Sequence, residues 1–191
     1  MTNLELNQTP IRTAKNYGIN NIKLENINIP ENISKFNGLE ISNSKVVIKE
    51  DDFENSFKYG NGDILAKQIK EKSNKSLNIE INENLTEELF LDFTFSKDNM
   101  NLIENIFIRA SENAKGTIIF RFKSIEDLEY YHNGQIKIVA EKNSKINIVI
   151  CNLMNNKTNY FLAIENITKE NAEIKYVTAE FGGKNTIINY Y

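Results

Sequence analysis

Alternating apolar and polar residues dominate the chain from residue 77 onward. Residues 77–81 follow a period of two, and so do the apolar positions between Leu89 and Phe95. Because successive side chains of a strand point to opposite faces, this pattern predicts strands with one buried face. A short helix is predicted to begin at Asp63 as its cap. Four residues would share its buried side: Ile64, Leu65, Gln68 and Ile69.

The first 60 residues show no clean period. Both prolines, Pro10 and Pro30, lie here, and residues 39–48 are the clearest strand-like stretch. Proline punctuates regular structure, so we expect a small, irregular α+β segment over residues 1–60. The remaining residues, 61–191, are predicted to form the core domain.

An internal repeat marks the second half. Three segments align on an asparagine, with spacings of 30 and 28 residues between anchors: Asn113, Asn143 and Asn171. A period-two strand begins three positions after each anchor, and an isoleucine stands seven positions before each one: Ile106, Ile136 and Ile164. Each repeat is therefore interpreted as strand, asparagine-centred turn and strand, because asparagine tolerates the left-handed conformation of such a turn.

A repeat of this size cannot bury its apolar face alone, whereas stacked copies bury it continuously. The absence of helical periods between the strands favours a parallel β-helix, an all-β solenoid, over helical or leucine-rich repeats. A β-sandwich with chance similarity at the turns is the alternative. Two apolar ladders are expected inside, the three isoleucines above and a second set: Ile118, Ile148 and Tyr176. A third row should face outward, covered by the N-terminal segment or by another subunit: Ile119, Val149 and Val177.

Composition excludes several classes. The net charge of -3 and the mixing of Lys with Glu along the chain give no basic face for nucleic acid. No apolar run approaches the roughly 18 residues of a membrane span, and the first residues resemble no secretion signal. Cys151 is the single cysteine, which rules out an internal disulfide and suits a reducing compartment. We therefore expect a cytoplasmic protein.

Several linked segments resemble the core of the SufB/SufD family, the scaffold proteins of the SUF iron–sulfur cluster assembly machinery. Residues 167–191, with their Glu-Asn-Ala turn and Gly-Gly-Lys, resemble the family's repeat, and residues 136–149 resemble the preceding coil. Residues 64–65, 76–81 and 88–94 resemble the start of the core. The resemblance implies a right-handed parallel β-helix and a non-enzymatic scaffold. It would act with a SufC-type ATPase and a SufB/SufD-type partner subunit, around a transient cluster that this chain alone does not bind stably.

In the family, further coils and a helical segment follow the point that corresponds to Tyr191. The resemblance therefore implies a β-helix truncated at its C-terminal end, from a SufD-like or minimal anaerobe-type scaffold. Since the ATPase docks on the later helical segment, these residues are expected not to capture it. They are also expected to form a homodimer or aggregate through the last coil.

Two residues are weak candidates for cofactor contact. Cys151 should share a ladder with Arg121 and Ala179 on the outer side of a strand, where arginine could favour the thiolate. An ordinary structural cysteine is the alternative to a transient ligand or persulfide carrier. His132 should share a ladder with Leu102 and Tyr160, as a satisfied, half-buried histidine or as a functional one.

No metal site and no catalytic residues are predicted, since one cysteine and one histidine cannot complete a tetrahedral site. Gly182-Gly183-Lys184 is interpreted as a bend between two faces of the solenoid, because a nucleotide-binding loop needs a following helix. Two other functional classes stay open. One is a β-helix carbohydrate-active lyase or hydrolase, and the other is a structural β-solenoid.

Overall fold

The computed structural model describes residues 1–6, 22–42, 46–50 and 60–191, and in that part the chain folds as a parallel β-solenoid with one helix. Part of the segment 1–60 that we predicted to be irregular lies outside the described residues. The elements are β1 Thr2–Leu6, β2 Ile22–Ile27, β3 Leu39–Ser42, β4 Val47–Lys49, α1 Asp63–Lys72, β5 Lys75–Ile81, β6 Leu89–Phe95, β7 Asn101–Ala110, β8 Lys115–Ser124, β9 Tyr131–Ala140, β10 Lys145–Leu153, β11 Asn159–Thr168, β12 Glu173–Glu180 and β13 Asn185–Tyr190.

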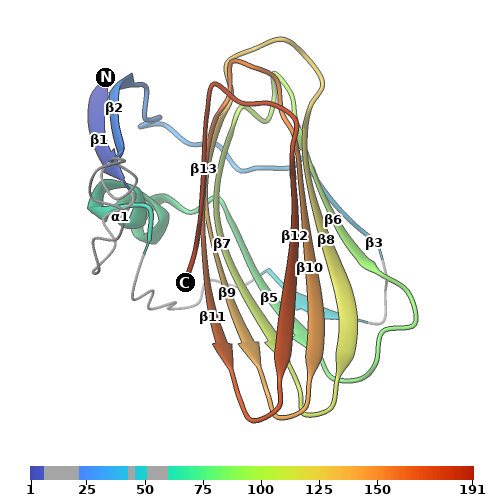
Figure 1. Ribbon diagram of the computed structural model, residues 1–191. Helices are drawn as coiled ribbons and strands as arrows, with labels where there is room; N and C mark the ends of the chain where they lie inside the picture. The colour runs from blue at the N-terminus through green and yellow to red at the C-terminus, as the bar shows by residue number, and fades with distance from the viewer. Residues whose placement is uncertain (7–21, 43–45, 51–59) are drawn as a thin grey trace.

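Two sheets face each other across the solenoid (Figure 1). One has the order β12-β10-β8-β6-β3 and the other β13-β11-β9-β7-β5-β4. Every pairing among β5 to β13 is parallel, whereas β3 and β4 join β6 and β5 antiparallel. The predicted parallel stacking is therefore confirmed. The strand-like stretch 39–48 differs from the prediction, because it contributes two short strands to different sheets.

The asparagine turns have the backbone conformation predicted for them. Asn113, Asn143 and Asn171 have φ angles of 64°, 59° and 55°. Their side chains also form a ladder, in which Asn143 Nδ2 donates to Asn113 Oδ1 at 3.1 Å and Asn171 Nδ2 donates to Asn143 Oδ1 at 3.4 Å. The asparagines therefore have two structural roles: they adopt the left-handed conformation of the turn, and they hydrogen-bond neighbouring coils to one another.

The turn conformation can be tested at Asn143. We expect Asn143→Ala to lower the free energy of unfolding by about 1–2 kcal/mol, because a residue with a Cβ is strained in the left-handed region. Asn143→Gly removes the same ladder hydrogen bond without that strain and should cost less than about 1 kcal/mol. Urea unfolding of both variants separates the two effects. Equal losses would assign the effect to the ladder instead of the backbone.

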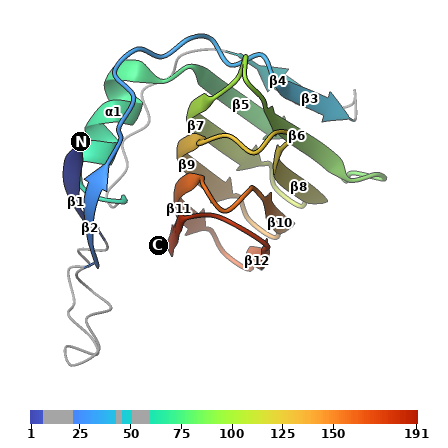
Figure 2. The same ribbon diagram turned by 90° about the horizontal axis from the view of Figure 1, so that it is seen from above.

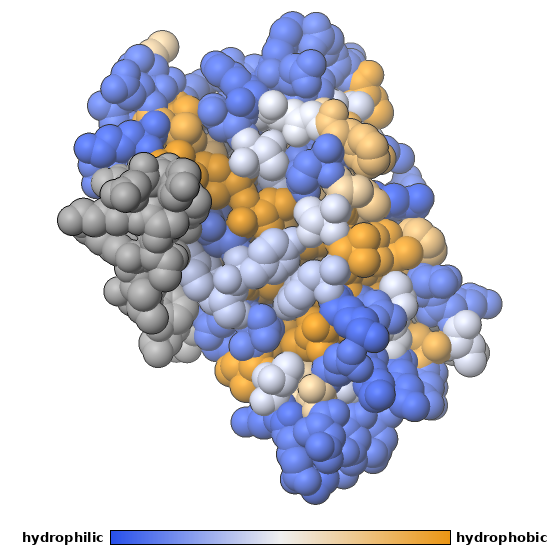
Figure 3. All heavy atoms as spheres, in the orientation of Figure 1, coloured by the Kyte–Doolittle hydropathy of each residue, from blue (hydrophilic) through white to orange (hydrophobic). Residues whose placement is uncertain are grey.

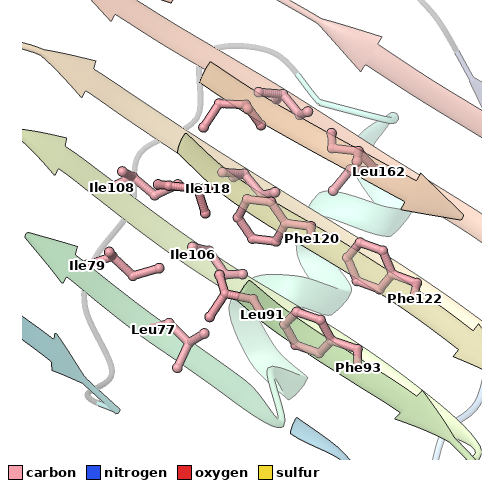
Figure 4. Packing of buried hydrophobic residues seen from close by; sticks show 14 of the residues in the cluster. Leu77, Ile79, Leu91, Phe93, Ile106, Ile108, Ile118, Phe120, Phe122 and Leu162 are labelled. Atoms are coloured by element: carbon pink, nitrogen blue, oxygen red, sulfur yellow. The ribbon is translucent and has the colours of Figure 1, made fainter. Parts of the chain in front are cut away.

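The core fills the space between the two sheets (Figure 4). The ladder Ile106, Ile136 and Ile164 is fully buried, as are Ile118 and Ile148. Tyr176, in the last coil, is partly buried and packs against the same cluster. Both predicted inward ladders are confirmed.

A second, smaller cluster lies outside the solenoid, on the outer face of the six-stranded sheet. The antiparallel pair β1–β2 and helix α1 run along the side of β7, β9 and β11 (Figure 2). Five of their apolar residues pack against three outward residues of the sheet; they are Leu4, Leu6, Ile27, Leu65 and Ile69 against Ile103, Tyr131 and Phe161. The described N-terminal residues therefore cover this face.

The outward row on the opposite sheet is not covered by these elements. Val177 is 59% exposed, and Ile119 and Val149 are half-buried. Strands β1 and β2 lie on the other sheet, and β3 joins the edge of this sheet beside β6. Cover by another subunit therefore stays a prediction.

The cap of helix α1 lies one residue earlier than the sequence predicted. Gly62 occupies the cap position with a φ of 100°, and no side chain caps the helix. Asp63 is instead the first helical residue, where its negative charge interacts favourably with the positive end of the helix dipole. Leu65, Gln68 and Ile69 are buried as predicted, but Ile64 is 46% exposed because it points away from the sheet.

Strands β12 and β13 form the last coil of the stack, and hydrophobic atoms are exposed at this end (Figure 3). These strands each have one neighbour in their sheet. Ile174 and Ile188 are partly buried there, packed against the core. Association through this coil, expected from the sequence, stays a prediction.

Candidate functional site

An acid and an imidazole face each other inside the apolar core. Glu104 on β7 and His132 on β9 both point inward and are fully buried, with 3.2 Å between Glu104 Oε1 and His132 Nε2. The predicted ladder is confirmed, since Leu102 and Tyr160 pair with His132 on its two sides. His132 is completely enclosed, not half-buried as predicted.

Aromatic rings surround the histidine. The ring centroids of Tyr160 and Phe122 lie 4.4 Å and 4.8 Å from that of His132. Gly134 supplies the space for the pair, since a Cβ there would lie 2.6 Å from Glu104 Oε1 and 2.8 Å from His132 Nε2. Any larger residue at this position would displace one of the two polar groups.

Most polar atoms of this cluster make no hydrogen bond that would offset the cost of their burial. Apart from the contact between them, both carboxylate oxygens of Glu104 and both ring nitrogens of His132 lack hydrogen-bond partners among the described residues, as does the Tyr160 hydroxyl. Burial, and next the charge of Glu104, raises the pKa of Tyr160 well above its usual value. Such burial is costly, and a buried ion pair is seldom better for stability than apolar residues of similar size. The cluster is therefore a candidate functional feature.

Cys151 lies on the other sheet and points outward. It pairs with Arg121 on β8 and Ala179 on β12, as predicted. However, the Arg121 guanidinium donates two hydrogen bonds to Asp92 and lies 4.7 Å above the ring of Phe90. Its charge is thus neutralised by a carboxylate, which weakens the case for an activated thiolate.

The two candidates from the sequence do not converge. Cys151 points out of the five-stranded sheet and His132 points into the core from the six-stranded one. Across the described ranges, no group of three or more His, Cys, Asp or Glu residues could hold a metal ion.

The role of Cys151 can be tested by substitution. We expect Cys151→Ala to change the free energy of unfolding by less than about 1 kcal/mol, as for most partly exposed sites away from special features. A larger loss of stability would contradict this expectation and assign the thiol a structural role in the packing of the sheet.

A second polar group lies near the glycine pair. Asn152 is buried and donates hydrogen bonds to Glu180 Oε2 at 2.7 Å and to the carbonyl of Gly182 at 3.3 Å. Burial raises the pKa of Glu180. A Cβ on Gly182 would lie only 1.8 Å from the carbonyl oxygen of Met154, so this close approach requires glycine. The segment joins β12 to β13, which confirms the predicted bend.

A polar groove of about 320 Å³ lies where the strands of the five-stranded sheet begin. Stacked lysines line it together with glutamates. Lys175 and Lys145 approach Glu173 at 3.0 Å and 3.9 Å. The pKa of Glu173 is lowered by its hydrogen bond to Lys175. The groove thus pairs acids with bases along the surface.

Sequence reasoning missed Glu104. It stands between Leu102 and Ile106 at an inward position of the period-two pattern, so counting from the anchor would have placed a carboxylate in the core. Its contact with His132 is diagonal across two strands, which the ladder alone does not reveal.

No described helix is long and apolar enough to cross a membrane. A search of curated proteins and a search of solved structures gave no significant match. A family model described as "SUF system FeS cluster assembly, SufBD core domain" matches residues 93–191, which run from the end of β6 through β13. The match covers the coils that carry Glu104, His132 and Cys151, and with it the chain belongs to the SufB/SufD family.

Proposed function

We propose that this chain is a scaffold subunit of SUF iron–sulfur cluster assembly, acting with a SufC-type ATPase and a SufB/SufD-type partner subunit. The observation that carries the proposal is the match of the SufBD core domain to residues 93–191. This range coincides with stacked parallel coils, so the matched sequence and the solenoid support the same role.

In this proposal the cluster is cargo, assembled transiently in the complex. Protein-bound clusters normally use four ligands. Cys151 and His132 lie on different sheets and point to different sides, so the proposal takes the ligands from more than one chain. A rigid solenoid suits such a task, because it holds surface residues of successive coils at fixed spacings.

Affinity capture tests the partnership. The full-length protein is tagged and co-expressed with its cognate ATPase, and a tagged unrelated β-solenoid serves as the control. We expect the ATPase to elute with the full-length protein in a fixed ratio and not with the control. Elution of the ATPase in neither case would contradict the proposed assembly.

A further inference from the structure

The outer face of the five-stranded sheet carries a row of apolar side chains, called here the outer row. Ile119, Val149 and Val177 stand in register on β8, β10 and β12, and Phe90 continues the row on β6. Val177 is 59% exposed, and the other three are half-buried. Single exposed apolar residues are ordinary, but an aligned row on neighbouring strands indicates an interaction surface.

Basic side chains lie on both sides of the outer row. Lysine and glutamate are mixed along the sequence, but only alternate residues of a strand face outward, so the fold separates them. Glu173 is the one acid that faces outward from β8, β10 and β12, whereas five bases do: Lys115, Arg121, Lys123, Lys145 and Lys175. The other acids of this face lie toward β6 and β3: Glu40, Glu88 and Asp92. Within the described ranges Lys115 and Lys123 form no ion pair, so the part of the face around the row is basic.

The sheet limits what kind of segment can lie on this face. Strands β6, β8 and β10 each have a neighbour on both sides, so their backbone groups are used in the ladders and none is free to bind a peptide. An occupant must therefore satisfy its own backbone, as an α-helix does. The chain itself gives an example on the other sheet, where Leu65 and Ile69 of α1 pack in one cluster with the outward residues Ile103 and Tyr131 (Figure 2). No described helix or strand lies over the outer row.

We propose that the outer row binds an amphipathic helix with acidic flanks, contributed by a partner protein. The apolar stripe of this helix lies on Ile119, Val149 and Val177, and its carboxylates face the lysines beside the row. A second copy of this chain would bring one basic face against another, and a nucleic acid would leave the apolar row in water. The inference does not depend on the proposed role in cluster assembly.

The spacing of the strands sets the length of the helix. Strands β6, β8, β10 and β12 lie about 4.8 Å apart, so the row is about 15 Å long. A helix rises about 1.5 Å per residue and covers this length with about ten residues, or three turns. On one side it borders the polar groove described above, where Lys115, Lys145 and Lys175 can reach its carboxylates.

Synthetic peptides test the proposal. The chain has no tryptophan, so one tryptophan in the apolar stripe of a peptide reports binding by its fluorescence. The acidic peptide is a helix of about 16 residues with leucine and tryptophan on one face and glutamate on both flanks. The control peptide has lysine in place of every glutamate. We expect saturable binding of the acidic peptide that weakens as salt is added, and binding of the basic peptide that is weaker by roughly tenfold or more.

Variants of the chain locate the interaction. Val177→Asp and Lys145→Glu should each weaken binding of the acidic peptide by roughly tenfold, because each places a negative charge against its apolar stripe or its carboxylates. Ile64→Asp and Lys67→Glu are the matched controls on α1, where both side chains are exposed, and they should leave binding unchanged. Circular dichroism checks that each variant is folded, and the exposed Lys145 tolerates its change most readily.

Alkylation of Cys151 gives an independent result. It is the single cysteine and faces outward on β10, two residues after Val149. A saturating amount of the acidic peptide should slow its reaction with iodoacetamide several-fold, and the basic peptide should not.

Three results with the peptides overturn the proposal: no binding, equal binding of both peptides, or binding that Val177→Asp and Lys145→Glu leave intact. Binding to phosphatidylglycerol vesicles without binding to the acidic peptide also overturns it and assigns the row to a lipid surface. A wild-type dimer in sedimentation that Val177→Asp dissociates overturns it as well, because a second copy would then occupy the row.

Discussion

Glu104→Met is expected to lower the free energy of unfolding by about 1–3 kcal/mol, the cost of leaving a buried polar group without its partner. His132 would then remain fully enclosed, with no hydrogen bond from the described residues and no carboxylate beside it. Methionine is chosen because its flexible side chain fills a similar volume. His132→Leu should cost a comparable amount, because it leaves Glu104 as the unpaired group.

The double variant Glu104→Met with His132→Leu should recover most of the loss, and it could exceed wild-type stability, since apolar residues pack in a core without a desolvation penalty. Urea unfolding of the four proteins completes the double-mutant cycle. Additive losses would contradict a direct pair. If the double variant is as stable as wild type but no longer supports cluster assembly, the pair is retained for function.

Phe122→Ala should cost about 3–5 kcal/mol, as for other large aromatic residues removed from a core. Phe122 is fully buried, and its ring stacks on Phe93 at 4.9 Å and meets Tyr160 at 5.4 Å. It also packs against His132, so its loss opens a cavity beside the polar pair. Thermal and urea unfolding measure the change.

Phe181→Ala is the control for this prediction. The same side chain is removed, but Phe181 is 73% exposed, so the expected change lies within about 0.5 kcal/mol. Similar losses in both variants would mean that Phe122 does not occupy the core position described here.

Much of the solenoid could be predicted because each coil repeats one local rule. Asn113, Asn143 and Asn171 mark turns whose positive φ is a property of the residue and its neighbours. Once the anchors are aligned, the period of two places Ile118 and Ile148 inside without knowledge of the rest of the fold. Register in a stacked sheet follows the hydrophobic pattern, which explains why these predictions were confirmed.

The remaining features depend on contacts between distant segments. Leu4 and Leu6 pack on the outer face of the six-stranded sheet, far from them in the sequence. The local pattern of apolar and polar residues does not predict such a contact. The pairing of Glu104 with His132 crosses strands diagonally, next to the space left by Gly134. The cap at Gly62 was missed because aspartate is the commoner capping residue and a cap depends on backbone geometry.

Anaerobic reconstitution tests the scaffold assignment most directly. The protein, together with the SufC-type ATPase and the SufB/SufD-type partner subunit proposed for it, is supplied with iron, sulfide and ATP, and cluster transfer to an apo-enzyme is followed by the activity regained. We predict that activity returns only when this protein is present, and that it falls when the protein is replaced by an unrelated β-solenoid. Equal recovery of activity without the protein would contradict the account.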